Sequence, residues 1–315
     1  MHHGHRHDGH THAPLSARAL RYSLAATFAY VLITLVAGIK AHSLALLSEA
    51  GHNVTDLLAL LLSWVAVFIQ TRPPSATKTF GYHRAGVLAA FVNALTLVAI
   101  AFYIFYEALM RMRNPVLVQP GIMIWVAVIG VIMNGTISWV LFRAARDVNI
   151  RSAFIHQLGD TLSTAAVIVG GCVIRWTGST WVDPALSIGI GALILWSSLG
   201  IIRETLNILL EGAPQGLSAE QISAILGKID GVRDVHDVHV WSLGSDTHAL
   251  SCHILIDDIT ISESHVILRN VTELLSTYHI DHTTIQLENV NCEVAHGCVV
   301  PIGSARQPEA IKSRR

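Results

Sequence analysis

The sequence predicts an α-helical membrane protein with six transmembrane helices, followed by a small α/β domain. Of its 315 residues, 52% are hydrophobic and only 14% are charged, whereas a soluble globular protein carries about 25% charged residues. Six stretches are long and apolar enough to cross a bilayer, which takes about 20 residues each. The charge density rises only beyond Ala213, where no further apolar stretch follows.

The chain begins with a histidine-rich stretch, residues 1–16. We predict a disordered cytoplasmic tail that collects metal ions, because dispersed His-rich tracts bind metal. An expression tag is the alternative, although tags are usually one unbroken run of His. The stretch lacks the apolar core of a cleavable signal peptide. Its candidate ligands are His2, His3, His5, His7, His10 and His12.

The transmembrane domain is predicted over residues 17–212. An even number of spans places both termini on one side of the membrane, and basic residues near span ends mark the cytoplasmic side. Nine basic residues flank the spans on the side of the termini and four on the other, so both termini are expected in the cytoplasm. The six expected spans cover residues 20–40, 44–69, 85–109, 121–142, 153–175 and 182–209.

Ionisable residues inside two spans are the main indication of function. His52 and Asp56 are four residues apart in the second span, and His156 and Asp160 repeat this spacing in the fifth. Each pair therefore shares one helix face. Ionisable groups within a membrane are costly and usually functional. If the faces meet, two imidazoles and two carboxylates converge, which suits a tetrahedral divalent ion such as Zn²⁺. A hydrogen-bonded structural role is the alternative, and the second copy of the pair disfavours it.

Three neighbours of these pairs also lead to expectations. Gly51 and Gly159 each adjoin a pair member and are expected to allow close helix approach. Glu49 lies one turn before His52 on a similar face. It either supports the ligands, lines the entrance to the site, or caps the helix end.

Residues 213–292 predict a soluble domain with the element order α-β-β-α-β. A helix is expected over residues 218–229, because a Ser in N-cap position precedes helical apolar spacing. Strands are expected over residues 235–244 and 247–258, where β-formers alternate around a Gly-Ser-Asp turn. An amphipathic helix over residues 262–278 and a short strand over 282–290 follow. Residues 293–315 are expected to form a flexible tail.

Strand periodicity indicates a second candidate metal site in this domain. His253 and Glu288 are expected to meet on the open face of the sheet, away from its apolar face. Periodicity alone favours His239 over His236 as their neighbour, because His236 has the parity of apolar residues in its strand. Ordinary surface side chains are the alternative. The four cysteines of the chain are too few for a disulfide scaffold, and are expected to be reduced thiols or metal ligands.

Five stretches together resemble the cation diffusion facilitator family: SLALLSEAGHNVTDLLAL, FGYHRAGVLAAFVNA, HQLGDTLSTAAVIVGG, VDPALSIGIG and VHDVHVWSLG. The resemblance covers about residues 16–292 and is closest to the bacterial cobalt-zinc-cadmium resistance type and to vesicular zinc transporters. It implies six spans, a cytoplasmic ferredoxin-like domain for metal binding and dimerisation, a homodimer in the bacterial inner membrane, and exchange of metal for protons.

The resemblance also implies roles for individual residues. It assigns the transported metal to His52, Asp56, His156 and Asp160, and a His at position 52 favours Zn²⁺. For the soluble domain it implies a regulatory zinc site, and there we follow it in choosing His236 over His239. It implies a further ligand, His83, at the cytoplasmic entry of the third span, where a His near lipid headgroups is the alternative. The implied ligands of the regulatory site are His236, His253, Glu288, Cys292 and Cys298.

These expectations predict a secondary transporter that exports Zn²⁺, and also Cd²⁺ or Co²⁺, in exchange for protons by alternating access. Metal and protons compete because ligands bind metal only when deprotonated. No ATP-binding motif G-x-x-x-x-G-K-[ST] occurs, and a net charge of −1 gives no indication of a nucleic-acid partner. One alternative is a membrane metalloenzyme, but His-Glu-x-x-His is absent and four protein ligands leave no open position. The other is a membrane-anchored metal sensor, for which two buried pairs are unnecessary.

Overall fold

The computed structural model describes residues 17–144, 148–244 and 247–290, and the side chains of residues 17–26, 141, 143–144, 148–153 and 156 lie outside this description. The chain divides into two compact units. The first comprises the chain up to Val65 together with Ala89–Ile202, and the second comprises Ala66–Leu88 and the chain from Arg203 onward. The predicted metal-collecting tail, Cys292 and Cys298 fall outside the described residues.

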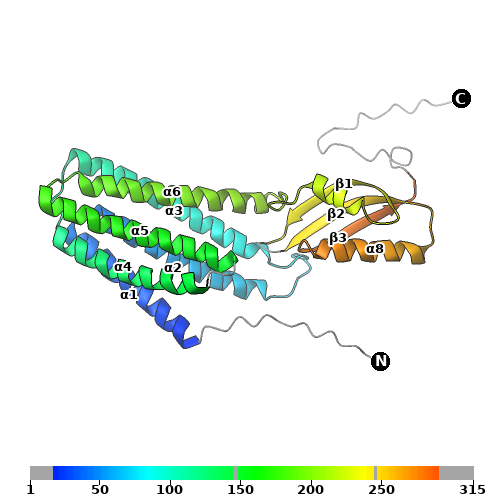
Figure 1. Ribbon diagram of the computed structural model, residues 1–315, viewed down its shortest axis with the longest axis horizontal. Helices are drawn as coiled ribbons and strands as arrows, with labels where there is room; N and C mark the ends of the chain where they lie inside the picture. Colours follow the sequence, from blue (N-terminus) through cyan, green and yellow to red (C-terminus); the bar gives the residue numbers. More distant parts are fainter. Residues whose placement is uncertain (1–16, 145–147, 245–246, 291–315) are drawn as a thin grey trace. The chain divides into compact units, whose positions relative to one another are not determined.

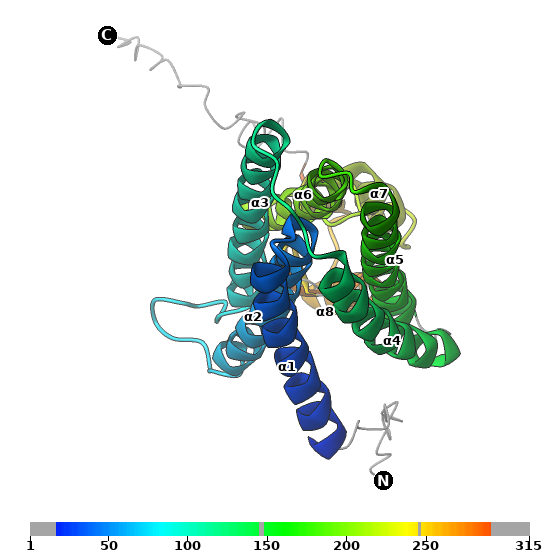
Figure 2. The ribbon, with the colours of Figure 1, turned by 90° about the vertical axis from the view of Figure 1, so that its left-hand side faces the viewer.

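Six long helices account for the apolar part of the chain (Figures 1 and 2). Each predicted span falls inside one of them. Helices α2 to α6 are long and apolar enough to cross a membrane, whereas the apolar part of α1 within the described residues, Thr27–Ala41, is shorter. The chain is therefore a multi-pass membrane protein. The helices are α1 (Ala17–Ala41), α2 (Leu44–Gln70), α3 (Arg84–Arg113), α4 (Pro120–Ala144), α5 (Val148–Thr177) and α6 (Val182–Leu209).

Small residues allow the helices of the first unit to pack closely. Ala41, Ala45, Ala101 and Ala127 are fully buried in its core. This suits helices in lipid, where small side chains let backbones approach. Helices α4 and α5 lie side by side (Figure 2), and a Cβ atom at Gly171 of α5 would lie 2.6 Å from a side-chain carbon of Ile124 in α4.

The two glycines that adjoin the predicted ligands, Gly51 and Gly159, do not lie at such close contacts between helices. A Cβ atom at Gly51 would lie 3.4 Å from Ile100 of α3, at ordinary contact distance. At Gly159 it would meet no described atom within 4 Å, because this position faces outward from α5. The expectation of close helix approach is therefore wrong for Gly159.

A buried carboxylate fixes the start of α2. Asp183, in the first turn of α6, is fully buried and accepts hydrogen bonds from the Ser43 hydroxyl at 2.6 Å and from the backbone N–H groups of Leu44 and Ala45 at 2.7 and 3.2 Å. The first N–H groups of a helix have no partner within it, so a residue of another helix supplies the cap. This contact fixes where α2 begins and hence the position of His52 along it.

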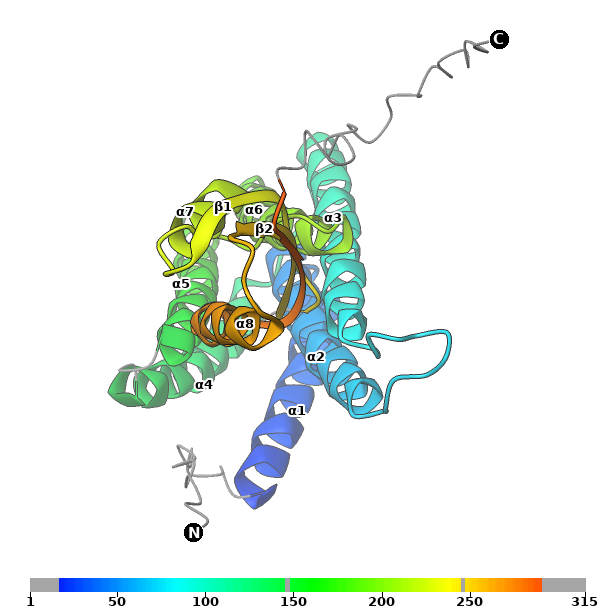
Figure 3. The same ribbon diagram turned by 90° about the vertical axis from the view of Figure 1, so that its right-hand side faces the viewer.

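The second unit contains the predicted α-β-β-α-β order. Its three strands form one sheet in the order β1-β2-β3, with β2 antiparallel to β1 and parallel to β3. Helices α7 and α8 both pack on one face of the sheet (Figure 3), where their apolar residues meet those of β2. The other face of the sheet therefore remains for polar residues. The elements are α7 (Ala219–Leu226), β1 (Val232–Ser242), β2 (His248–Ile256), α8 (Ile261–Ser276) and β3 (Ile280–Glu288).

A bulge in β1 reverses the strand's periodicity between its two halves. The register with β2 shifts between His236 and His239, and Asp237 has a φ of 51°. Val235 and Val240 both lie in the core although their separation is odd. An extra residue in one strand has this effect, because it moves every later side chain to the opposite face. His236 therefore faces away from the core, and the expectation from regular periodicity, which favoured His239, is wrong.

Candidate metal sites

The ionisable side chains of α2 and α5 meet within the first unit. The Nε2 atom of His52 lies 2.9 Å from Oδ1 of Asp160 and 3.6 Å from Oδ2 of Asp56. One ligand atom from each of the three residues lies within 4.8 Å of the other two. The helix faces that the two four-residue spacings define are thus brought together. An imidazole and two carboxylates at this separation can share one divalent cation.

The fourth predicted ligand, His156, lies one turn before Asp160 in α5. Residues four apart share a helix face, so its backbone position is on the side that carries Asp160. Its side chain is outside the described part of the structure.

Burial makes this cluster favourable for a cation. The side chains of His52 and Asp160 are only 14% and 13% exposed, and that of Asp56, one turn farther toward Gln70, is 34% exposed. Two carboxylates beside one imidazole concentrate negative charge in a weakly polar environment, where an uncompensated charge is costly. A divalent ion would neutralise that charge and complete the coordination of the oxygens.

Glu49 does not cap α2. The cap is provided by Asp183, and Glu49 lies within the helix with only 1% of its surface exposed. Its Oε1 atom lies 2.6 Å from the hydroxyl oxygen of Thr164 in α5. The capping alternative is therefore wrong, and Glu49 belongs to the surroundings of the ligand cluster.

A second cluster lies on the open face of the C-terminal sheet. His236, His253 and Glu288 occupy β1, β2 and β3, so neighbouring strands supply one residue each. Nδ1 of His253 lies 2.9 Å from Oε1 of Glu288, and Nε2 of His236 lies 3.4 Å from Oε2. The imidazole rings meet edge to face with centroids 5.5 Å apart. Ligand atoms from all three residues lie within 4.8 Å of one another.

Three atoms of this second cluster are buried without a hydrogen bond among the described residues: Nε2 of His236, Nδ1 of His253 and Oε2 of Glu288. Buried polar atoms are nearly always satisfied, and a cation at their centre would satisfy all three together. Oδ2 of Asp234 lies 3.1 Å from Nδ1 of His236, and such an outer carboxylate orients the ring and leaves Nε2 for a metal.

The other predicted ligands lie elsewhere. His239 is 57% exposed and lies 3.1 Å from Asp237. His83 lines a pocket of about 440 Å³ with Asp281 and His282, among other residues. It belongs to neither of the two clusters found among the described residues.

Cys252 is a core residue of the C-terminal domain. It is 1% exposed and packs among the apolar residues beneath the sheet. Burial raises the pKa of its thiol to about 11. Since only the thiolate binds metal well, Cys252 is unsuited to be a ligand at neutral pH.

Known protein families cover both units. Residues 20–210 match the model of the cation efflux transmembrane domain, and residues 214–290 match that of the cation efflux protein cytoplasmic domain. The model of the first domain thus includes every residue of the cluster in α2 and α5. The model of the second includes His236, His253 and Glu288.

Three relatives are similar along nearly their whole length. The zinc transporter ZitB of Escherichia coli is 38% identical over 93% of this chain and 94% of its own. The cadmium, cobalt and zinc/H(+)-K(+) antiporter of Bacillus subtilis is 35% identical over 89% and 92%. The metal cation efflux system protein CzcD of Cupriavidus metallidurans is 35% identical over 93% and 92%. The chain therefore belongs to the cation diffusion facilitators, a family of metal cation transporters and not of enzymes.

Proposed function

We propose that this chain exports Zn²⁺, and also Cd²⁺ or Co²⁺, from the cytoplasm in exchange for protons. The transport site is formed by His52, Asp56, His156 and Asp160. The main support for the proposal is that ligand atoms of His52 and Asp56 in α2 and of Asp160 in α5 lie within 4.8 Å of one another inside the apolar helices. The printed names of the relatives, which include zinc, cadmium and cobalt, support this choice of metals.

The mechanism follows from competition between metal and protons at one site. Imidazole and carboxylate groups bind metal only in their deprotonated forms, so the site loads from the near-neutral cytoplasm. When it opens alternately to the other side, protons displace the metal, and inward proton flow drives outward metal flow. Four protein ligands fill a tetrahedral shell and leave no position for a reacting water. This favours carriage of the ion.

Zinc flux into proteoliposomes tests the proposal. Asp160→Asn keeps the shape of the side chain but removes the charge 2.9 Å from His52, so we expect zinc flux and the accompanying proton flux to fall to background. Asp258→Asn, the same change on an exposed loop residue, should transport like the wild type. Wild-type flux in Asp160→Asn contradicts the site. A wild-type protein that binds zinc without moving it would instead favour the membrane-anchored sensor.

The C-terminal domain is proposed to regulate transport. We assign it a ferredoxin-like fold that pairs two copies as a homodimer and binds Zn²⁺ at His236, His253 and Glu288. The three buried atoms without hydrogen bonds support this second site. The tail thiols Cys292 and Cys298 are proposed to complete its coordination.

The remaining assignments concern the membrane and the entry route. Both termini are proposed to lie in the cytoplasm, with the spans in a bacterial inner membrane. The histidine-rich residues 1–16 are proposed to collect metal for the transport site. His83 is proposed as an entry ligand. Asp281 and His282 line the same pocket, so a carboxylate and a second imidazole accompany His83 there.

A further inference from the structure

Helices α1 and α4 are held together at one end and separate toward the other. At the end of α1, the carbonyl oxygen of Ala41 accepts a hydrogen bond at 2.9 Å from the backbone N–H of Gln119, which directly precedes α4. Ala37 and Ala41 of α1 share a buried core with Met123 and Ala127 of α4. Toward their opposite ends the two helices diverge (Figures 2 and 3).

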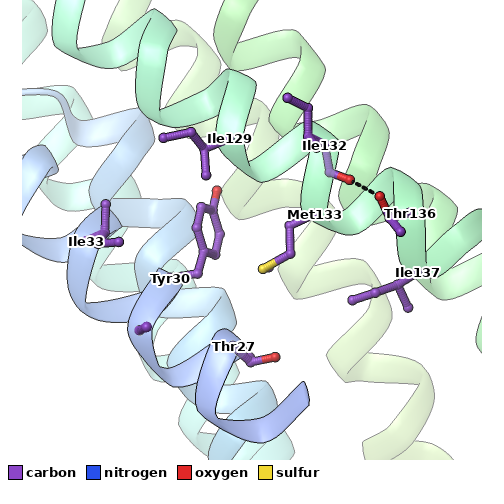
Figure 4. Close-up of a pocket in the computed structure, with 9 residues that line it drawn as sticks. Thr27, Tyr30, Ile33, Ile129, Ile132, Met133, Thr136 and Ile137 are labelled. Atoms are coloured by element: carbon purple, nitrogen blue, oxygen red, sulfur yellow. Dashed lines mark hydrogen bonds between the residues drawn. The ribbon is translucent and has the colours of Figure 1, made fainter. Parts of the chain in front are cut away.

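Tyr30 of α1 marks the point at which the helices separate. A Cβ atom at Gly130 of α4 would collide with the Tyr30 hydroxyl, so the glycine lets the phenol ring rest against α4. Figure 4 shows the ring reaching from α1 toward α4, with its hydroxyl beside Ile129. Gly130 is the central residue of the apolar stretch Pro120–Val140. The separation therefore begins near the middle of the bilayer.

A groove of about 490 Å³ lies between the two helices from this point onward. Its walls are almost entirely apolar, and its isoleucines Ile33, Ile129 and Ile132 are exposed. None of the described residues that line it is charged. The hydroxyl of Thr136 donates its hydrogen to the carbonyl oxygen of Ile132 at 2.6 Å (Figure 4). The groove therefore suits a hydrocarbon chain and not a polar ligand.

The groove has the length and the position of one lipid leaflet. Its α4 wall, from Ile129 to Ile137, is about 12 Å long, and half of a typical hydrocarbon core is about 15 Å thick. It runs from the middle of the bilayer toward the helix ends at Ala17 and Ala144, which we have placed on the cytoplasmic side. Apolar cavities exclude water. An acyl chain that enters from the cytoplasmic leaflet would fill the groove as far as Tyr30.

Basic residues at the same helix ends provide charge for a phosphate group. Arg143 follows Thr136 by two helical turns in α4, so its backbone position is on the face that lines the groove. It lies about 9 Å beyond Ile137, where a headgroup follows its acyl chain. Arg18 and Arg21 occupy the first turns of α1. Anionic lipids of the cytoplasmic leaflet attract such residues at the membrane surface.

We propose that the groove between α1 and α4 binds one acyl chain of an anionic phospholipid from the cytoplasmic leaflet, with the phosphate group at the level of Arg143. The inference rests on the proposed placement of both termini in the cytoplasm, and not on the proposed metal site. Thr164 of α5 also lies over Gly130, so the helix that carries Asp160 packs against α4 at the inner end of the groove. The bound chain favours the separated arrangement of α1 and α4, because it occupies the space between them.

Lipid retention by the full-length protein tests the proposal. Native mass spectrometry in mild detergent, during titration with phosphatidylglycerol or with phosphatidylcholine of identical chains, counts the lipids retained per chain. The wild type should retain one lipid at a severalfold lower concentration of phosphatidylglycerol than of phosphatidylcholine. Ala29→Trp fills the groove from an exposed position in its wall and should remove this lipid. Ala192→Trp, the same change at an exposed position of α6, should retain it, and Arg143→Gln should lose the preference for phosphatidylglycerol.

Equal retention of the two lipids by the wild type refutes recognition of an anionic headgroup. Unchanged retention in Ala29→Trp shows that the lipid is bound elsewhere and overturns the proposal. A wild-type dimer that Ala29→Trp disrupts would show that a second copy of the chain covers the groove, which overturns it as well. If Ala29→Trp does not fold, phosphatidylglycerol with a diazirine near the end of one acyl chain gives the answer on the wild type. Crosslinks should concentrate on peptides that contain Ile33 and Ile129, and an even spread over the exposed helix faces refutes a specific site.

Discussion

At the scale of single residues, the imidazole at position 52 is expected to set the metal preference. His52 lies between Asp56 and Asp160, so His52→Asp replaces a borderline nitrogen ligand by a third hard oxygen. Harder sites favour harder or larger ions over zinc. We expect Cd²⁺ or Mn²⁺ transport to rise relative to Zn²⁺ in competition flux assays. His239→Asp, at an exposed histidine of the C-terminal domain, is the matched control. An unaltered order of preference in His52→Asp would show that this imidazole does not bind the transported ion.

Individual residues differ in how far the sequence could predict their place. The four-residue spacing was enough to predict that the two members of each pair share one helix face, because helix geometry is periodic. The meeting of His52 with Asp160, which is 108 residues away, was a hypothesis based on the repeat of the pair. Thr164 was missed although it lies one turn after Asp160. Its partner Glu49 is 115 residues away in the chain, and no local pattern links a threonine to a distant carboxyl. Asp183 was missed as a cap for the same reason, since caps are normally sought next to their own helix.

At the scale of elements, the shared contact between α6 and α2 is expected to contribute strongly to stability. Asp183→Ala leaves the Ser43 hydroxyl and two backbone N–H groups buried without an acceptor. An unsatisfied buried donor costs about 1–3 kcal/mol, so the loss should total at least about 3 kcal/mol. Thermal unfolding in detergent should show a lower midpoint, with Asp258→Asn as an exposed control. A midpoint within a degree or so of the wild type would refute the cap.

Strand β2 offers a second expectation, which concerns pH. Burial raises the pKa of the Cys252 thiol from 9.0 to about 11. A group whose pKa is raised on folding contributes stability below its unfolded pKa and loses it as pH rises through the folded pKa. The stability should therefore be constant up to about pH 9 and decline by about 2 kcal/mol toward about pH 11. In the folded protein Cys252 should resist alkylation at about pH 9, as read by peptide mass spectrometry, and should react fully in urea. Rapid alkylation of the folded protein would contradict a buried, neutral thiol.

The elements of the C-terminal domain were predictable in kind, and the bulge was not. Alternation and turn residues were enough to predict two strands around Gly244 and the helix after Ser218. The capping partner of Ser218 is Gln221. The shift between His236 and His239 depends on one residue, Asp237, with a positive φ. Non-glycine residues rarely adopt this conformation, so a regular strand was the natural expectation, and it wrongly assigned His236 to the apolar face of the sheet, although His236 lies with His253 and Glu288.

At the scale of the whole molecule, hydropathy predicted the membrane part, whereas the grouping of the chain into units required the structure. The segment Ala66–Leu88 belongs with the C-terminal part. Within that unit Arg84 lies 3.3 Å from Glu211, and the ring of Phe80 meets that of His282 edge to face. Such pairs carry no periodic signal, because they join a connection between two spans to residues far along the chain.

This division into units gives the last prediction, which separates regulation from transport. His253→Ala combined with Glu288→Ala removes two of the three converging groups in the C-terminal cluster and leaves every ligand of α2 and α5 in place. The purified double variant should bind one zinc fewer per chain, and zinc flux should fall severalfold without reaching the background of Asp160→Asn. We expect this fall because zinc bound at the C-terminal cluster can alter transport from a distance only by favouring one transport state of the protein over the other. His239→Ala, on the same strand as His236 but outside the cluster, should leave both measurements unchanged. If the double variant binds as much zinc as the wild type, the open face of the sheet is no metal site. If it binds less zinc but transports at the wild-type rate, the C-terminal metal does not regulate.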